Sequence, residues 1–423
     1  MSLKLFKFGG ASIKDAAHIK NLGTLLGSAG DTNILLVVSA MGKTTNALEK
    51  CWHQFFEVSE EQCRSCIDEI ITRHLNVAED LGVDTTTLKT KYDDFTREAF
   101  NRLKQISYPS KSAVYDQLVS LGELFSTYLL YLYLKLIEFD VLWIDVRGII
   151  ITDDNYQDAR IDWELTQAKV NKYLRPMIQK HKLVITQGFI AAGENKMTTT
   201  LGREGSDYTA AALANCMDLK ELTVWKDVPG ILTADPRKFE KVEKLEELSY
   251  REAIELSYYG AQVIHPKTIR PLQNKSIQLN VRCFYDPDAP GTVICGKQQD
   301  KYPPMVVIQN DVIILEFSSR DFSFIGENHL SHIFQTLDKY NIRLCTMRNS
   351  AISFTMSIKN PGDDKLAILV DELKGDFNIK LNKGLDLYSI RHYNETLLAE
   401  IVEGRKVLFK ERLRNTIQLI MTC

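Results

Sequence analysis

Apolar residues fall into short continuous runs in the first part of the chain, and longer segments with helical spacing separate these runs. The runs at 33–38 and 183–186 have no alternating polar position, which predicts strands buried on both faces. Further strands are predicted at 3–8, 141–144 and 222–225, and helices over 45–108, 112–137 and 206–217. This alternation of strands and helices predicts a three-layer α/β fold with a mainly parallel central sheet.

The pattern changes after a segment rich in residues that break regular structure. These residues are Pro287, Pro290, Gly291, Gly296, Pro303 and Pro304. Beyond this junction we predict strands at 312–317, 342–347, 352–358, near Leu387 and Leu397 and at 417–421, and helices at 329–340, 363–373 and 402–415. We therefore expect a first domain over 1–290 and two small βαβ-type units over 305–423, either divided near 360 or interleaved.

Composition limits the classes of protein that the chain can represent. Of 423 residues 44% are hydrophobic, and 52 Lys+Arg against 55 Asp+Glu give a net charge of −3. This balance argues against binding to nucleic acid or to an anionic membrane through bulk charge. No run of eighteen apolar residues and no signal peptide is found, so we expect a cytoplasmic protein.

The eight cysteines fit that expectation, because most are scattered in apolar contexts that are typical of reduced thiols. Cys51, Cys63 and Cys66 lie closer together, but with His53 they do not have the spacing of a zinc site. We interpret them as structural cysteines and predict no metal site made of protein ligands.

Two segments near the N-terminus could contact phosphate. Lys7 ends a predicted strand and is followed by Gly9 and Gly10, whose backbone could approach a phosphate while the lysine supplies charge. An ordinary turn is the alternative. The Gly42-Lys43-Thr44 segment is not a P-loop, because Val37 stands where that motif needs a glycine.

Later segments add charged residues at predicted ends of strands and helices. In the loop 201–209, Ser206 or Asp207 caps an Ala-rich helix, whose N-terminus is a potential anion site. Asp227 and Arg237 follow a strand, where open α/β sheets bind nucleotides. A capped helix and ordinary turns are the alternatives. A glycine within a predicted helix, next to Glu123, indicates close packing or a ligand.

Together, and in this order, the segments resemble the aspartate kinases of the amino acid kinase family. The segments that carry the resemblance are 7–12, 37–42, 122–124, 187–190, 202–210, 225–237 and 252–266. The resemblance implies ATP-dependent phosphorylation of the L-aspartate β-carboxylate to 4-phospho-L-aspartate, the first step toward lysine, threonine and methionine. It also implies a kinase domain followed by two ferredoxin-like ACT domains that pair chains into a homodimer or homotetramer.

The resemblance assigns roles to matching residues. Lys7 and Asp207 would be catalytic, with Arg203 on the α-carboxylate of aspartate and Glu123 on its ammonium group. The complete aspartate site would be Thr45, Glu123, Phe189, Arg203 and Ser206. The ATP site, with Mg²⁺ on the phosphates, would be Lys7, Gly9, Gly10, Ser39, Lys226, Asp227, Arg237 and Gln262.

The sequence departs from the family pattern at several of these positions. Gln262 replaces a lysine that contacts phosphate, and we hypothesise that Lys226 or Lys267 compensates. Glu204 replaces a glycine in the substrate loop, which adds a carboxylate there. Leu232 and Ala11 also differ from the usual residues.

The expected effector region differs as well. Ser350 is retained, but Cys345 and Ala351 stand where lysine-inhibited relatives have carboxylates. A cationic effector would lose charge-assisted hydrogen bonds, so we predict weak or absent inhibition by lysine.

Two alternative functions stay open at the level of sequence. The chain could be an amino acid kinase with another substrate, although Glu123 and the Arg203 loop favour aspartate. It could also be a catalytically weak ligand sensor that acts through its ACT domains, as the substitutions at 204 and 262 suggest.

Overall fold

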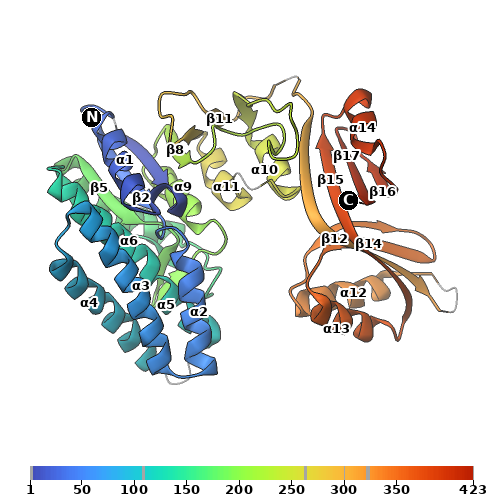
Figure 1. The fold of residues 1–423 in the computed structure, drawn as a ribbon, viewed down its shortest axis with the longest axis horizontal. Coiled ribbons are helices and arrows are strands. Elements are labelled where there is room, and N and C mark those ends of the chain that lie inside the picture. Colours follow the sequence, from blue (N-terminus) through green and yellow to red (C-terminus); the bar gives the residue numbers. More distant parts are fainter. Residues whose placement is uncertain (1–2, 107–109, 262–263, 300, 321–323, 423) are drawn as a thin grey trace. The chain divides into compact units, whose positions relative to one another are not determined.

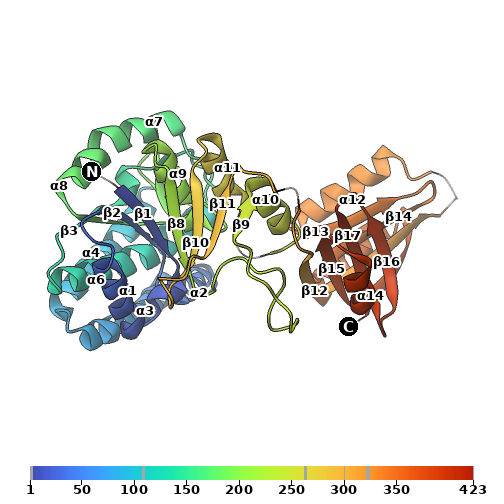
Figure 2. The same cartoon turned by 90° about the horizontal axis from the view of Figure 1, so that it is seen from above.

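The computed structural model describes residues 3–106, 110–261, 264–299, 301–320 and 324–422, and the chain forms two compact units (Figures 1 and 2). The first unit comprises Met1–Ile231, Lys244–Ile254 and Val263–Gln298. The second unit comprises Leu232–Glu243, Glu255–Gln262 and Gln299–Cys423. Two short segments therefore leave the first unit and belong with the C-terminal residues.

The first unit is built around a central sheet. Its strands are β1 Leu3–Phe8, β2 Asn33–Val38, β3 Val141–Trp143, β5 Leu183–Gln187, β8 Glu221–Lys226, β9 Glu247–Ser249, β10 Gln278–Cys283 and β11 Thr292–Cys295. Among the described residues they lie in the order β3-β5-β2-β1-β8-β10-β11-β9, and β10–β11 is the antiparallel pair. Every residue of β2 is buried, as its continuous apolar run predicts.

Helices cover both faces of this sheet. The helices of the first unit are α1 Ala16–Gly27, α2 Thr44–Glu57, α3 Glu60–Leu81, α4 Thr85–Lys104, α5 Lys111–Val119, α6 Leu121–Leu136, α7 Trp163–Lys169, α8 Arg175–Lys180, α9 Gly205–Cys216, α10 Tyr250–Tyr258 and α11 Pro266–Asn274. Figure 2 shows α1, α3, α4 and α6 on one side of the sheet and α7, α8 and α9 on the other. The predicted three-layer α/β fold is thus confirmed.

The carboxyl ends of the central strands lie at one edge of the sheet and position the candidate site. Phe8 at the end of β1 is in register with Val38 of β2 and with Trp225 of β8. Val38 is in turn in register with Gln187, the last residue of β5. Polar residues that follow these strands are therefore brought together, although long stretches of sequence separate them. A second, small sheet consists of β4 Ile151–Thr152, β6 Ile190–Gly193 and β7 Thr198–Thr200. Its strand β6 directly follows β5 in the chain.

Helices α2 and α3 contain the three cysteines that we interpreted from the sequence as structural. Cys51 of α2 and Cys66 of α3 form a disulfide, with their Cα atoms 5.5 Å apart. The sequence did not specify what structural role these cysteines have, and the two packed helices give this pair one by bringing together residues fifteen positions apart. Cys63 is buried and unbridged.

The second unit contains an antiparallel sheet with helices α12 Glu327–Lys339, α13 Asp363–Leu373 and α14 Glu395–Val402. Its strands are β12 Met305–Ser319, β13 Leu344–Asn349, β14 Ser353–Lys359, β15 Phe377–Arg391, β16 Val407–Arg412 and β17 Thr416–Thr422. Within the described residues the order is β13-β14-β12-β15-β17-β16. This antiparallel sheet, with its helices, agrees with the predicted ferredoxin-like ACT domains.

Two predicted elements of this unit are wrong. Leu397 lies in helix α14 and not in a strand, since Leu398 and Ile401 form its buried helical face. The helix predicted over 402–415 is replaced by β16, which pairs with β17 at an edge of the sheet. Antiparallel pairing with the next strand, β17, overrides the local helical spacing there.

In the part of the chain that the structure describes, neither unit has a helix that could span a membrane or a cluster of side chains that could bind a metal ion. No described helix combines the length and apolarity needed to cross a bilayer. No group of three or more His, Cys, Asp or Glu side chains is arranged to hold a metal ion among these residues.

Candidate active site

A buried ion pair joins the two residues predicted to be catalytic. Lys7 is 7% exposed near the end of β1, and Asp207 is 1% exposed in the first turn of α9. Lys7 Nζ lies 2.5 Å from Asp207 Oδ1. Burial raises the pKa of the Asp207 carboxyl, but the ammonium groups of Lys7 and Lys226 outweigh it, so that the pKa lies below its ordinary value.

Lys226 is the second cation at this carboxylate. It is the last residue of β8, and its Nζ lies 3.5 Å from Asp207 Oδ2. Lys267 instead pairs with Asp158 and donates to the backbone oxygen of Leu201. Of the two lysines that could replace the family's lysine at position 262, Lys226 is therefore the one beside Asp207.

The residues predicted to bind aspartate meet at one cavity of about 350 Å³. All five, Thr45, Glu123, Phe189, Arg203 and Ser206, line it together with Ser39. The cavity also contains residues that the sequence did not single out as ligands, namely Tyr115, Gln157 and Thr200. Thr200 belongs to a polar run before the Arg203 loop, which was a usable signal, whereas no local pattern marks Tyr115 or Gln157.

Glu123 is held by the backbone of the loop that follows β2. Ala40 N donates to its Oε1 at 3.2 Å, and burial raises the pKa of the carboxyl to about 8. The other oxygen, Oε2, has no hydrogen-bond partner among the described residues. A Cβ atom on the neighbouring Gly122 would lie 3.0 Å from Ala40 Cβ, so this glycine permits close packing of α6 against the loop.

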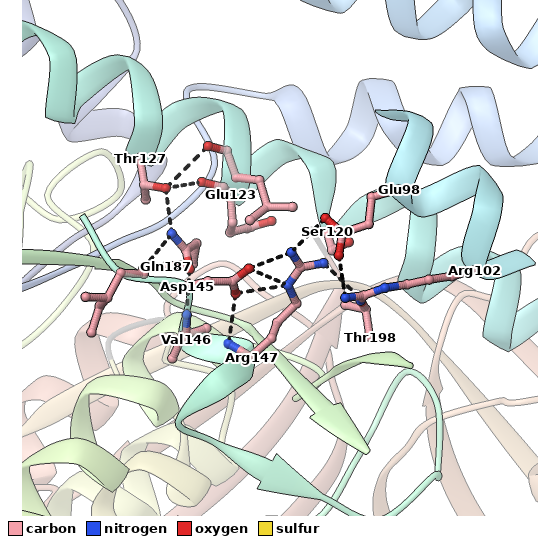
Figure 3. A network of polar contacts seen from close by, with 12 residues as sticks. Glu98, Arg102, Ser120, Glu123, Thr127, Asp145, Val146, Arg147, Gln187 and Thr198 are labelled. Carbon is pink, nitrogen blue, oxygen red and sulfur yellow. Dashed lines mark hydrogen bonds and ion pairs between the residues drawn. The ribbon is translucent and has the colours of Figure 1, made fainter. Parts of the chain in front are cut away.

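A chain of hydrogen bonds fixes the helix that carries Glu123 (Figure 3). Thr127 Oγ1 donates to the backbone oxygen of Glu123 at 2.8 Å and accepts from Gln187 Nε2 at 2.9 Å. Val146 N donates to Gln187 Oε1 at 2.8 Å. Because Gln187 ends β5, this network ties helix α6 to the carboxyl edge of the sheet.

An arginine cluster continues the network. Arg147 forms a bidentate pair with Asp145, and both Arg147 and Arg102 donate to Thr198 Oγ1 (Figure 3). Glu98 pairs with Arg102 at 2.6 Å. Each arginine is paired with a carboxylate, and the hydrogen bonds of both arginines to Thr198 hold β7 in place.

Small residues allow the backbone to close around the site. A Cβ atom on Gly10 would lie 2.3 Å from the backbone oxygen of Ala40, and one on Gly188 would lie 2.6 Å from Ser206 Cβ. Ser206 Oγ donates to Ser39 Oγ at 3.0 Å. The predicted phosphate turn at Gly9–Gly10 therefore packs directly against the loop after β2.

Asp116 is a buried carboxyl that orients the cavity wall. Its oxygens accept from Gln157 N, Thr200 N and Thr200 Oγ1, at 2.8 to 3.2 Å. Burial raises its pKa to about 7, although these hydrogen bonds act in the opposite direction. Asp116 thereby holds Gln157 and Thr200 in place beneath the cavity.

Comparison with known proteins places the chain in a family. The model of the amino acid kinase family matches residues 2–283. Lysine-sensitive aspartokinase 3 of Escherichia coli strain K12 is 31% identical over 402 residues, which cover 91% of this chain and 86% of that protein. The chain belongs to the aspartokinases of the amino acid kinase family. The resemblance drawn from the seven sequence segments is confirmed.

A plant relative and a solved structure show how far the likeness extends. Aspartokinase 2, chloroplastic, of Arabidopsis thaliana is 33% identical over 365 residues, 84% of this chain. The chain spans 66% of the length of this plant protein. A crystal structure of E. coli aspartokinase III in complex with aspartate and ADP (R-state) is 26% identical, with a TM-score of 0.80, and covers 100% of this chain and 96% of that one. The aspartokinase fold therefore extends over both units.

The residues expected at the ATP site do not all lie in one unit, whereas those expected to bind aspartate line a single cavity. Lys7, Gly9, Gly10, Ser39 and Lys226 lie at the carboxyl edge of the sheet, and Asp227 is exposed directly after β8. Arg237 belongs to the second unit, where it pairs with Asp235 at 2.8 Å. Gln262 lies outside the described residues.

Proposed function

We propose that the chain transfers the γ-phosphoryl group of ATP to the β-carboxylate of L-aspartate, forming 4-phospho-L-aspartate and ADP. The observation that supports it most is the convergence of five predicted substrate residues on one cavity, next to the Lys7–Asp207 pair. The E. coli relative with aspartate and ADP adds support, because this chain shares its fold over its whole length.

The charges around the cavity suit an amino acid with two carboxylates. Arg203 would fork onto the α-carboxylate, and Glu123, with an oxygen that has no partner among the described residues, would accept from the α-ammonium group. The β-carboxylate would then point toward Lys7 and Lys226. We assign Thr45, Phe189 and Ser206 to the walls that orient the substrate.

Phosphoryl transfer needs little covalent chemistry from these residues. A β-carboxylate oxygen is already ionised at neutral pH, attacks the γ-phosphorus, and the bond to the β–γ bridging oxygen breaks to release ADP. Lys7 and Lys226 would neutralise the charge that develops on the phosphoryl oxygens, while Asp207 holds both ammonium groups in position.

Magnesium would be carried by the ATP phosphates. Asp207 already pairs with two lysines, and no cluster of three metal-binding side chains exists among the described residues. The protein would therefore contribute few or no direct ligands to the ion. We assign Ser39, Asp227, Arg237 and Gln262 to the nucleotide, as the family resemblance implies.

The assembly and location of the protein form part of the proposal. Strands β13 and β16 end the sheet of the second unit, which leaves edges for pairing between chains into a homodimer or homotetramer. Light scattering after size-exclusion chromatography would measure that state. We expect the enzyme to act in the cytoplasm.

A coupled assay for ADP release tests the activity. We expect turnover with ATP and L-aspartate, and none with L-glutamate or N-acetylglutamate. Trapping of the product by hydroxylamine would identify the acyl phosphate. Turnover with another amino acid would favour a different kinase specificity, and no turnover with any amino acid would favour a ligand sensor.

A further inference from the structure

Two glutamates reach the aspartate cavity from different parts of the chain. Glu123 belongs to α6, Glu204 belongs to the turn that precedes α9, and both line the cavity. Both Oε2 atoms are buried, and neither has a hydrogen-bond partner among the described residues. A buried carboxylate oxygen without a partner is costly, so both oxygens indicate a donor that comes with a ligand.

At its two glycines, the loop that carries Glu204 has no room for a side chain. A Cβ atom on Gly202 would lie 2.5 Å from Asp158 Oδ1, and one on Gly205 would lie 2.7 Å from the Phe189 ring. Arg203 and Glu204 are therefore the side chains that this loop presents to the cavity.

The backbone at this position is unusual for a glutamate. Glu204 has φ 52° and ψ 30°, the left-handed region that favours glycine. Its carboxylate does not cap α9. A strained non-glycine residue at the rim of a ligand cavity suggests that the side chain contributes to function.

The donor that fits both oxygens is a cation. Arg203 forms no ion pair with the described residues, lies at the cavity, and is the expected partner of a substrate carboxylate. Lys7 and Lys226 are both held by Asp207. Both lysines beside Asp207 are therefore already paired, and with Arg203 on the substrate's carboxylate, the substrate's ammonium group would supply the positive charge next to Glu204.

We propose that Glu204 is a second carboxylate partner of the substrate's α-ammonium group and determines specificity for an amino acid over a plain dicarboxylic acid. Glu123 and Glu204 would hold the ammonium group from two sides. This inference rests on the proposed function, since it concerns how the same cavity recognises aspartate.

The test compares two ligands that differ only in the amino group. Binding of L-aspartate and of succinate is measured by calorimetry on the full chain and on Glu204→Gln, which keeps the shape of the side chain but removes its charge. We expect aspartate affinity to fall about tenfold, because hydrogen bonds to charged groups are worth more than neutral ones. Succinate affinity should stay unchanged or rise.

Two control variants separate recognition from structure. Glu204→Gly removes the carboxylate and relieves the left-handed backbone, and it should lose discrimination between the ligands to the same extent. Glu194→Gln changes an exposed glutamate of the β6–β7 hairpin that does not line this cavity, and it should affect neither ligand.

The outcomes distinguish this inference from the activity on which it rests. If Glu204→Gln weakens aspartate and succinate equally, or changes neither, Glu204 does not recognise the ammonium group. If Glu204→Gln binds aspartate less well because a smaller fraction of the variant is folded, its affinity for ATP falls in parallel. The inference is then again overturned. If the unaltered protein neither binds nor phosphorylates aspartate, the proposed function itself fails.

Discussion

Buried carboxyl groups dominate the site at the scale of single residues. Asp207 is ionised beside two lysines, whereas burial raises the pKa of Asp116 to about 7 and that of Glu123 to about 8. The same side-chain type thus has opposite charge preferences within one site, and the neighbouring cations decide which one applies.

The raised pKa of Asp116 predicts a pH-dependent stability. Its ordinary value is 3.8, so the folded protein binds this proton more tightly than the unfolded chain does. The stability that results is fully present below pH 4 and is lost as pH rises through about 7. The loss should be roughly 4 kcal/mol, since one pKa unit corresponds to about 1.4 kcal/mol.

Urea unfolding of Asp116→Asn between pH 4 and pH 8 measures this effect. We expect the variant to show a weaker fall in the free energy of unfolding with rising pH than the unaltered protein. Glu123 titrates in both proteins, so the difference between them reports on Asp116. Asp68→Asn, on an exposed face of α3, serves as a control and should keep the original slope. An unchanged slope in Asp116→Asn would contradict the prediction.

At the scale of elements, parallel strands create the edge of the sheet at which the candidate active site lies. Lys7 comes from β1 and Lys226 from the end of β8, and the pairing of these two strands places both ammonium groups on Asp207. The sequence left Lys226 and Lys267 as equal candidates, because both lie near the motifs. The register of β8 favours Lys226.

Alanine substitutions separate these two lysines in the ADP-release assay. Lys226→Ala should lower kcat about 100-fold, because it removes a charge next to the transferring phosphoryl group, where electrostatic groups typically contribute on the order of 10²–10³. Lys267→Ala should change kcat by less than about threefold, since that lysine pairs with Asp158 and an exposed pair contributes little. A larger loss in Lys267→Ala than in Lys226→Ala would reverse the assignment.

At the scale of the whole molecule, the compact units do not follow the order of the sequence. Residues 232–243 and 255–262 belong with the C-terminal unit. Val306 N donates to the backbone oxygen of Thr233 at 2.8 Å, and Arg391 pairs with Glu255 at 3.0 Å. Arg237, which we assign to ATP, therefore belongs to the unit that contains the ACT sheet.

The region of this unit where the resemblance places an effector gives a further prediction. Cys345 contacts Gln309 Oε1 at 3.4 Å, and burial raises the pKa of its thiol, so it supplies no negative charge to a cation. Calorimetry should therefore detect weak or no binding of L-lysine, and lysine should not inhibit the assay. Tight binding that is lost in Ser350→Ala would show this prediction to be wrong.

The sequence by itself determined the strands of the kinase sheet, the order of the motifs and the five residues proposed to bind aspartate, which line one cavity. These features depend on short-range patterns, namely continuous apolar runs and glycine turns at strand ends. Tertiary structure alone decided which lysine faces Asp207, that Tyr115 and Gln157 join the cavity, that Cys51 bonds to Cys66, and that β16 is a strand. Each of these depends on contacts between separate helices, strands or loops, which the residue pattern within a single segment does not encode.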